Sequence, residues 1–392
     1  MSKALIFIVF LSVSTIIVLS IHYYLWLRLI RDTGFSRLYH NTGTYLLIAL
    51  AISFPLALFV DKIASVKYSF PLLWLSYFWI GAMMLLFFLL VSMDIIKIVP
   101  CLFHKLTWAG KGVINPERRE FVSTMFATAA SATVFIASGI GVKNYYSTAI
   151  VKKYNVLLKN LPETFKGFKI VQISDLHIGQ MMSGKTLKLI VDQVNNLKPD
   201  LIAITGDIAD GSVAKLLQEV KPLKKLKAPK GIYFVTGNHE YYSGVEEWTL
   251  AIKKMGITVL NNENIKIKRG SDYFYLAGVT DHEGKRFGKR HAADFKKALF
   301  GLKSDKKKIL LAHQPIAVQK ASNFGTDLVL AGHTHGGQIW PFNYFVYLQQ
   351  PYLKGFYEYQ GTRLYVNQGT GCWGPPIRLG SHNEITQITL DA

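Results

Sequence analysis

Four long apolar runs in the first 150 residues limit most strongly what this chain of 392 residues can fold into. A helix needs about 20 apolar residues to cross a bilayer, and these runs approach or exceed that length. Because three more apolar runs follow the first, a cleavable signal peptide is a poor explanation. We predict a membrane region over residues 1–150 with about four transmembrane helices, at 5–27, 44–60, 70–92 and 121–142.

The positive charges of the loops indicate an orientation for these helices. The loops 28–43 and 93–120 carry eight Lys and Arg residues, whereas the amino terminus and the loop 61–69 carry three. Since loops rich in Lys and Arg stay in the cytoplasm, the part after Val142 is expected on the extracytoplasmic side of a cell membrane. The protein would then be a multi-pass membrane protein.

The sequence Glu117–Val122, just before the fourth run, contains the arginine pair Arg118 and Arg119. This pair resembles a twin-arginine export signal, and it is equally an ordinary positive flank of a membrane helix. Both interpretations give the same topology. The four runs contain almost no ionisable residues, so anchoring is favoured over transport.

The remainder of the chain is basic and contains no nucleic-acid motif. Residues 151–392 hold 33 Lys and Arg against 20 Asp and Glu, a formal charge of +13. This balance suits phosphate substrates or anionic lipid, or it keeps a domain soluble beside a membrane. We expect no nucleic-acid partner.

Strand-like runs alternate with helical patterns after residue 151. This alternation predicts an α/β layered sandwich as the catalytic domain over residues 151–392. A strand pair is expected within 266–279, broken at Gly270, and the segment 145–161 is expected to be a connector. The other expected strands are 169–174, 201–205, 231–236, 308–312 and 327–331, and the expected helices are 185–197, 213–223 and 245–255.

Five of these strands end in polar clusters. In open α/β sheets, ligands bind beyond the carboxyl ends of the strands, so these clusters should meet at one rim. Carboxylate, imidazole and amide oxygen donors suit Mn, Fe, Zn, Mg or Ni, and their number suits two ions that share a bridging carboxylate. The clusters are Asp175 with His177, Asp207, Asn238 with His239, His313, and His333 with His335.

The ordered set of motifs from Phe168 to His335 resembles the calcineurin-like metallophosphoesterases. The resemblance implies a two-sheet β-sandwich flanked by helices, in four layers α/β/β/α, and a phosphoric ester hydrolase. The tail Val366–Gly369 with Pro376–Arg378, and the membrane region, are similar to a membrane-associated bacterial subgroup with a twin-arginine-like signal. The motifs are Asp175-x-His177, Gly206-Asp207-x-x-Asp210, Gly237-Asn238-His239-Glu240, His313 and Gly332-His333-x-His335.

The resemblance also implies a role for each residue of the motifs. Two divalent ions (Mn²⁺, Zn²⁺ or Fe²⁺) would hold a bridging hydroxide that attacks phosphorus. His239 would protonate or stabilise the leaving oxygen, and Asp210 would orient His239, although a helix N-cap is the alternative for Asp210. The first ion would be bound by Asp175, His177 and His335, the second by Asn238, His313 and His333, and Asp207 would bridge them.

The sequence motifs indicate the class of reaction more closely than they indicate the substrate. Membrane attachment and the basic domain favour a phospholipid or a cell-envelope phosphate, with monoester and diester both open. One alternative is a hydrolase of the lipid A pathway that cleaves a UDP-2,3-diacylglucosamine diphosphate, whose substrate is cytoplasmic. Another is a non-catalytic interaction module on the same fold.

Three further features have two interpretations each. The pair Asp281 and His282 would reach the rim of the site or be solvated. The aromatic stretch 340–347 with Phe356, Tyr357 and Tyr359 would form a lipid-facing lip or a packed sheet edge. Arg378 would contact phosphate or stabilise a turn.

Overall fold

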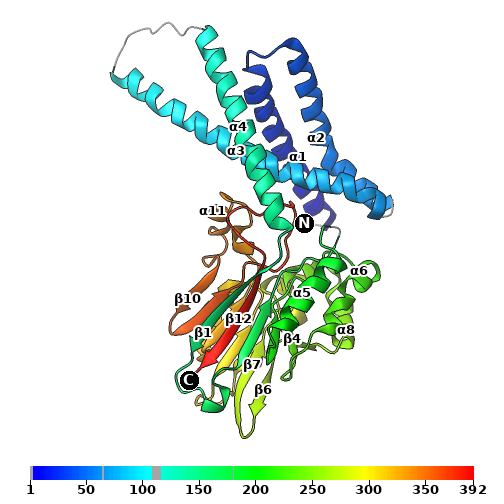
Figure 1. Cartoon of the computed structure of the whole chain (residues 1–392), viewed down its shortest axis with the longest axis vertical. Coiled ribbons are helices and arrows are strands. Elements are labelled where there is room, and N and C mark those ends of the chain that lie inside the picture. Colours follow the sequence, from blue (N-terminus) through cyan, green and yellow to red (C-terminus); the bar gives the residue numbers. More distant parts are fainter. Residues whose placement is uncertain (1–2, 64–65, 108–115, 180) are drawn as a thin grey trace. The chain divides into compact units, whose positions relative to one another are not determined.

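The computed structural model describes residues 3–63, 66–107, 116–179 and 181–392. The chain forms two compact units, one of Met1–Val142 with Pro375–Ile377 and the other of Lys143–Gly374 with Arg378–Ala392. We call them the amino-terminal unit and the carboxyl-terminal unit (Figure 1). Lys111, one of the positive loop residues counted above, lies outside the described residues.

Four long helices make up the described part of the amino-terminal unit. All four contain a stretch that is long and apolar enough to cross a membrane. The π-helix η1 (Leu27–Arg31) continues the first helix, and Arg28 on it pairs with Asp94 at 2.8 Å. The helices are α1 (Lys3–Trp26), α2 (Arg37–Ile63), α3 (Val66–Thr107) and α4 (Pro116–Tyr145).

Two six-stranded mixed sheets form the centre of the carboxyl-terminal unit. The first has the order β1 (Ile150–Leu157), β12 (Glu384–Asp391), β2 (Lys169–Ile173), β3 (Leu201–Ile204), β4 (Ile232–Phe234) and β5 (Thr258–Val259). The second has the order β10 (Gly355–Tyr359), β11 (Thr362–Val366), β9 (Leu328–Ala331), β8 (Lys308–Leu311), β7 (Asp272–Gly278) and β6 (Glu263–Arg269).

Helices cover the outer faces of both sheets. On the first sheet lie α5 (Gly184–Asn196), α6 (Val213–Val220) and α8 (Val245–Lys254), and on the second lie α9 (Phe295–Leu299) and α10 (Val318–Ala321). Shorter helices lie in the connections between these elements: α7 (Asn238–Ser243), α11 (Asn343–Val346) and 3-10 turns at Glu163–Phe165, Lys221–Lys225, His282–Phe287, Lys289–His291, Pro315–Ala317, Ser322–Phe324 and His335–Gly337.

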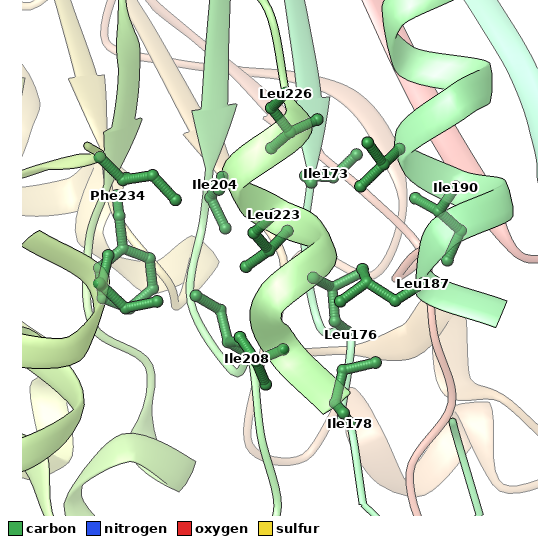
Figure 2. Close-up of a cluster of buried hydrophobic side chains, with 14 of the residues drawn as sticks. Ile173, Leu176, Ile178, Leu187, Ile190, Ile204, Ile208, Leu223, Leu226 and Phe234 are labelled. Atoms are coloured by element: carbon green, nitrogen blue, oxygen red, sulfur yellow. The ribbon is translucent and has the colours of Figure 1, made fainter. Parts of the chain in front are cut away.

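Three apolar cores separate these layers. One lies between the sheets, where Phe168 and Phe274 are fully buried. Another lies between the first sheet and its helices, where Ile173 and Ile204 belong to one buried cluster with Leu187 and Leu223 (Figure 2). The third packs α9 and α10 on the second sheet. The predicted four-layer α/β/β/α architecture, preceded by apolar helices, is confirmed.

Two details differ from the expected elements. The segment 145–161 is no simple connector, because it contains β1, which pairs in parallel with β12. The helix expected over 213–223 ends as an α-helix at Val220 and continues as a 3-10 turn that contains Pro222. Proline lacks the N–H that an α-helical hydrogen bond requires, which explains the change.

Candidate metal centre

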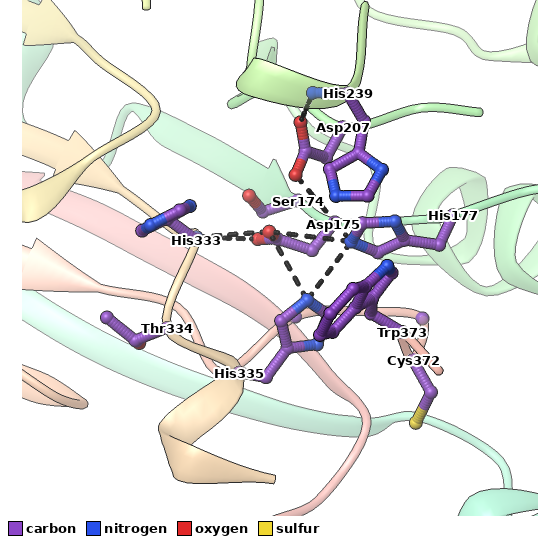
Figure 3. Close-up of polar contacts among 12 residues, drawn as sticks. Ser174, Asp175, His177, Asp207, His239, His333, Thr334, His335, Cys372 and Trp373 are labelled. Carbon is purple, nitrogen blue, oxygen red and sulfur yellow. Dashed lines mark hydrogen bonds and ion pairs between the residues drawn. The ribbon is translucent and has the colours of Figure 1, made fainter. Parts of the chain in front are cut away.

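The carboxyl ends of five strands bring all nine expected site residues to one rim. In the first sheet, β2, β3 and β4 are parallel neighbours, and in the second sheet β8 and β9 are parallel. Parallel strands end at the same edge, so their following turns converge there. Figure 3 shows Asp175, His177, Asp207 and His335 of these turns around a common centre, with the backbone N–H of His333 donating to Asp175.

Asp175, His177 and His335 form the first set of possible metal ligands. One ligand atom from each lies within 4.8 Å of the others, and all three residues are buried. The Nε2 atoms of His177 and His335 are 3.1 Å apart. Asp175 Oδ1 is 3.6 Å from His335 Nε2 and 4.0 Å from His177 Nε2.

Asp207, His313 and His333 form the second set, again with one atom each within 4.8 Å of the others. His313 Nε2 lies 3.1 Å from His333 Nδ1 and 3.2 Å from Asp207 Oδ2. The amide oxygen of Asn238 lies 3.1 Å from the same His313 nitrogen. With Asn238, all four residues expected around the second ion therefore converge here.

Asp207 lies between the two sets. Its Oδ2 atom is 3.2 Å from His313 Nε2 and 3.7 Å from His177 Nε2. Its other oxygen accepts a hydrogen bond from the backbone N–H of His239 at 2.9 Å. The carboxylate is thus fixed with one oxygen directed at both sets, as a bridging ligand requires.

The donor atoms fit two divalent ions. Ligands about 2.0–2.2 Å from one cation lie roughly 3 Å apart, which is the spacing of the imidazole nitrogens in each set. Nitrogen, carboxylate and amide oxygen donors without sulfur suit Mn²⁺, Zn²⁺ or Fe²⁺. The His/Asp cluster therefore suits a dinuclear divalent metal site.

Two of the rings are oriented by hydrogen bonds on the side away from the centre. His177 Nδ1 bonds Asp210 Oδ1 at 2.8 Å, and His313 Nδ1 bonds the Thr205 carbonyl at 2.8 Å. An acceptor at Nδ1 fixes the proton there and leaves Nε2 free as a metal ligand. A third group of atoms within ligand distance of one another comes from His177, Asp210 and His239. In this group the Asp210 carboxylate is already paired with the Nδ1 atoms of both rings, so it serves to orient them.

The charges of these side chains shift one another's pKa. Burial opposes the charge on His177, yet the Asp210 carboxylate raises the pKa of His177 to about 9. Burial also opposes the charge on Asp210, but His177 and His239 lower the pKa of Asp210 to about 2. Burial, and then the charge of His313, lowers the pKa of His333 to about 3, so that its ring is neutral.

Five of the seven expected metal ligands have a left-handed backbone. Their φ angles are positive although none is glycine, a conformation that costs about 1–3 kcal/mol and persists only where the surroundings enforce it. Such turns direct side chains inward immediately after a strand ends. The angles are 52° at Asp175, 45° at His177, 54° at Asp207, 73° at His333 and 51° at His335.

Two motif glycines allow the turns to approach one another closely. A Cβ atom on Gly237 would overlap Asp207 Oδ1, and one on Gly332 would overlap Ser174 Oγ and Asp175 Oδ2. Any side chain at these positions would displace a carboxylate of the cluster. The glycines therefore set the distance between the strand ends.

Sequence reasoning missed the structural role of Glu240. This buried carboxylate accepts hydrogen bonds from the backbone N–H groups of Asp207, Ile208 and Gly237, at 3.0, 2.7 and 2.7 Å. It thereby joins the turn of the proposed bridging residue to the turn of Asn238. The spacing Gly237-x-x-Glu240 matches the glutamate half of a capping box, a signal that could have revealed only the bond to the Gly237 N–H.

Asp281 lies outside the ligand sets. It is buried and caps the 3-10 turn His282–Phe287 by accepting from the Glu283 N–H. It also lines a cavity of about 120 Å³ beside His313. Burial raises the pKa of Asp281 to about 6, despite the opposing effect of His313.

Arg378 stabilises a loop, in agreement with the turn interpretation. Its side chain is fully buried, and its guanidinium donates to the carbonyl oxygens of Gln368, Gly369, Gly371 and His382. The aromatic residues divide between both interpretations. Tyr357 and Tyr359 are half-buried in the edge strand β10, whereas Trp340, Tyr344, Phe345 and Tyr347 are exposed, as is Phe356 of the same strand.

The calcineurin-like phosphoesterase family matches residues 168–337 of the chain. A transmembrane protein with metallophosphoesterase domain from Bos taurus is 37% identical over 302 residues, covering 74% of this chain and 68% of that protein. Its counterpart from Danio rerio is 35% identical over 324 residues, covering 81% and 73%. An uncharacterised metallophosphoesterase of Campylobacter jejuni is 32% identical over 307 residues, covering 78% of each chain. The chain therefore belongs to the calcineurin-like metallophosphoesterases, as a membrane-associated hydrolase of phosphoric esters.

Proposed function

We propose that this hydrolase cleaves a phosphoester of a membrane phospholipid or another cell-envelope phosphate, with two divalent ions bound at the rim. The observation that carries the proposal is the pair of ligand sets on either side of Asp207 Oδ2, with His239 beside them. This arrangement supports dinuclear phosphoester hydrolysis more than it supports a binding module, because no expected ligand is missing.

Each proposed role follows from the position of the side chain. Asp175, His177 and His335 would hold the first ion, Asn238, His313 and His333 the second, and Asp207 would bridge them. Mn²⁺, Zn²⁺ or Fe²⁺ in these positions would supply Lewis-acid polarisation of the phosphoryl oxygens.

His239 would act on the leaving group. Its Nδ1 lies 2.7 Å from Asp210 Oδ1, and the ring is partly exposed at the rim. With the Nδ1 proton directed to Asp210, the Nε2 atom is available to the departing oxygen of the substrate. General acid assistance of this kind contributes about 10²–10⁴-fold to a rate.

Three features support a lipid or cell-envelope substrate. The chain is anchored by apolar helices, its carboxyl-terminal part is basic, and the exposed rings of Tyr242 and Trp373 lie beside His239. We further propose that this part lies on the extracytoplasmic side, on the basis of the loop charges. A reporter fused after Ala392 tests this topology, and a cytoplasmic signal would favour the diphosphatase of the lipid A pathway instead.

The substrate class can be tested with the full-length chain in lipid nanodiscs supplied with Mn²⁺. A panel of soluble monoesters, soluble diesters and phospholipids should give turnover with at least one phospholipid or envelope phosphate. An Asp175→Asn variant should lose both turnover and one of two bound metals. If the wild-type protein binds two metals and hydrolyses no member of the panel, the interaction module is the better description.

A further inference from the structure

An uncharged aromatic segment of the carboxyl-terminal unit is exposed. In a chain of formal charge +20, residues 340–351 contain no Asp, Glu, Lys or Arg. Soluble surfaces seldom concentrate apolar side chains in this way, so such a patch marks an interaction site. We name residues 340–348 the aromatic segment. Its exposed members are Trp340 at 55%, Tyr344 at 61%, Phe345 at 52%, Tyr347 at 46% and Leu348 at 84%.

The aromatic segment is joined by hydrogen bonds to the place where the chain leaves α4. Trp340 N–H donates to the Leu379 carbonyl at 2.8 Å. In the same loop, the Arg378 carbonyl accepts from Asn144 Nδ2 at 3.1 Å, and Asn383 Nδ2 donates to the Tyr145 carbonyl at 3.0 Å. These residues all belong to the carboxyl-terminal unit, so the loop 378–383 holds the aromatic segment beside the last residues of α4.

The chain directly before the aromatic segment, at Gln338, is also connected to the catalytic rim. Gln338 forms two hydrogen bonds with the backbone of Trp373, donating to its carbonyl at 2.7 Å and accepting from its N–H at 3.2 Å. The half-exposed ring of Trp373 lies 5.9 Å from the ring of His239. The aromatic segment thus connects the exit of a membrane helix with the site.

We propose that the aromatic segment inserts into the lipid surface from which α4 emerges, and that the substrate phosphoester reaches the catalytic rim along it. Trp and Tyr favour the membrane interface because their rings are apolar and carry one polar group. Tyr146, directly after α4, is exposed as well and fits the same depth. The insertion itself is independent of the catalytic role, whereas the substrate path rests on the proposed function.

Insertion can be measured without any enzymatic activity. The full-length chain with Cys101→Ser keeps Cys372, which is 3% exposed, and takes a fluorophore at Leu348→Cys. Phe300→Cys is the matched control, because Phe300 is 70% exposed and follows α9 on the second sheet, outside the aromatic segment and the loop 378–383. In phosphatidylcholine nanodiscs, spin-labelled lipid should quench the probe at 348 and aqueous iodide should quench the probe at 300. Equal iodide quenching at both positions would overturn the proposal.

The substrate path is tested by comparing two substrates in one preparation. For Trp340→Ser with Leu348→Ser, the ratio of turnover on a bilayer phospholipid to turnover on soluble bis-p-nitrophenyl phosphate should fall about tenfold, because two apolar anchors are lost. The ratio should stay unchanged for Phe300→Ser. An unchanged ratio in the double variant would refute the path. Absence of hydrolysis by the wild-type protein would refute the proposed function and leave the quenching result valid.

Discussion

Asp210 Oδ1 lies 2.7 Å from His239 Nδ1. The same oxygen lies 2.8 Å from His177 Nδ1, so a single carboxylate orients two rings with different proposed roles. The Nε2 atom of His177 faces the first ligand set, and that of His239 is available to a leaving group. Asp210 therefore orients both His177, a proposed metal ligand, and His239, the proposed acid, so a change at Asp210 should affect both functions.

We expect Asp210→Asn to weaken both metal binding and turnover. The amide cannot accept two N–H bonds as strongly as the carboxylate, so affinity for the first ion should fall about 10–100-fold. Turnover at saturating metal should still fall about 10²-fold or more, because His239 is no longer held. Metal titration with elemental analysis, combined with kcat on a soluble ester, measures both effects.

His239→Ala is the matched variant for that experiment. It should lose turnover to a similar extent and retain two metals, because His239 belongs to neither ligand set. If Asp210→Asn binds both ions with wild-type affinity, Asp210 acts through His239 alone and its bond to His177 is dispensable.

His333 and His335 come from one turn and should serve different ions. His333 Nδ1 is 3.1 Å from His313 Nε2, and His335 Nε2 is 3.1 Å from His177 Nε2. We expect His333→Ala and His335→Ala each to retain about one ion, with the second ion weakened by the loss of one ligand. Elemental analysis gives the count for each variant. Combining His335→Ala with Asp175→Asn should remove no further ion, whereas combining it with His313→Ala should remove both.

The strands that lead into the rim, and the rim residues themselves, could be predicted because they depend on local patterns. An apolar run followed by a polar turn marks a strand end, and parallel strand ends meet at one edge. The strand β1 could not be predicted in this way. Its half-exposed pattern contains Lys152 and Lys153, and it is stabilised by pairing with β12 at the other end of the sequence.

The finer details of the site also depend on contacts between distant turns. Nothing in the sequence near Glu240 indicates that its carboxylate accepts from the N–H of Asp207 on another strand. Asp210 gives a second example: its contact with His239 was expected from the sequence, but its bond to His177 was not. These contacts arise from positive φ angles and close glycines, which sequence patterns describe poorly.

Glu240→Ala should destabilise the site, because it removes an acceptor that three backbone N–H groups share. The buried N–H groups of Asp207, Ile208 and Gly237 would lose their common acceptor. An unsatisfied buried donor costs about 1–3 kcal/mol, so the unfolding temperature should fall and the proposed bridging ligand should shift. Differential scanning fluorimetry and metal content measure the two effects. Glu247→Ala, an exposed position on α8, should change neither, and equal behaviour of both variants would contradict this role.

Asp281→Asn should stabilise the protein at neutral pH. Asp281 Oδ1 accepts from Glu283 N–H at 2.8 Å and Gln314 Nε2 at 3.1 Å, while Oδ2 has no hydrogen-bond partner among the described residues. Asparagine can keep both bonds through its oxygen without a buried charge.

The stability that Asp281→Asn gains over the wild-type protein should increase as pH rises. Because burial raises the pKa of Asp281 to about 6 from an ordinary value of about 3.9, the folded protein retains a proton that the unfolded chain releases. The stability from this protonated form is complete below about pH 4 and is lost as pH rises through about 6. The advantage of Asp281→Asn over the wild-type protein should thus grow by on the order of 2 kcal/mol between pH 4.5 and pH 8.

Unfolding temperatures at pH 4.5, 6 and 8, in a chelator so that metal loading does not vary, measure the pH dependence of Asp281→Asn. Asp294→Asn is the control, because Asp294 is an exposed cap of α9 and its replacement should give no comparable rise above pH 5. A constant difference between Asp281→Asn and the wild-type protein at all three pH values would show that Asp281 is charged in the folded state throughout. The cavity beside His313 would then have to supply a partner for Oδ2, because an unpaired buried carboxylate cannot remain ionised without such a partner.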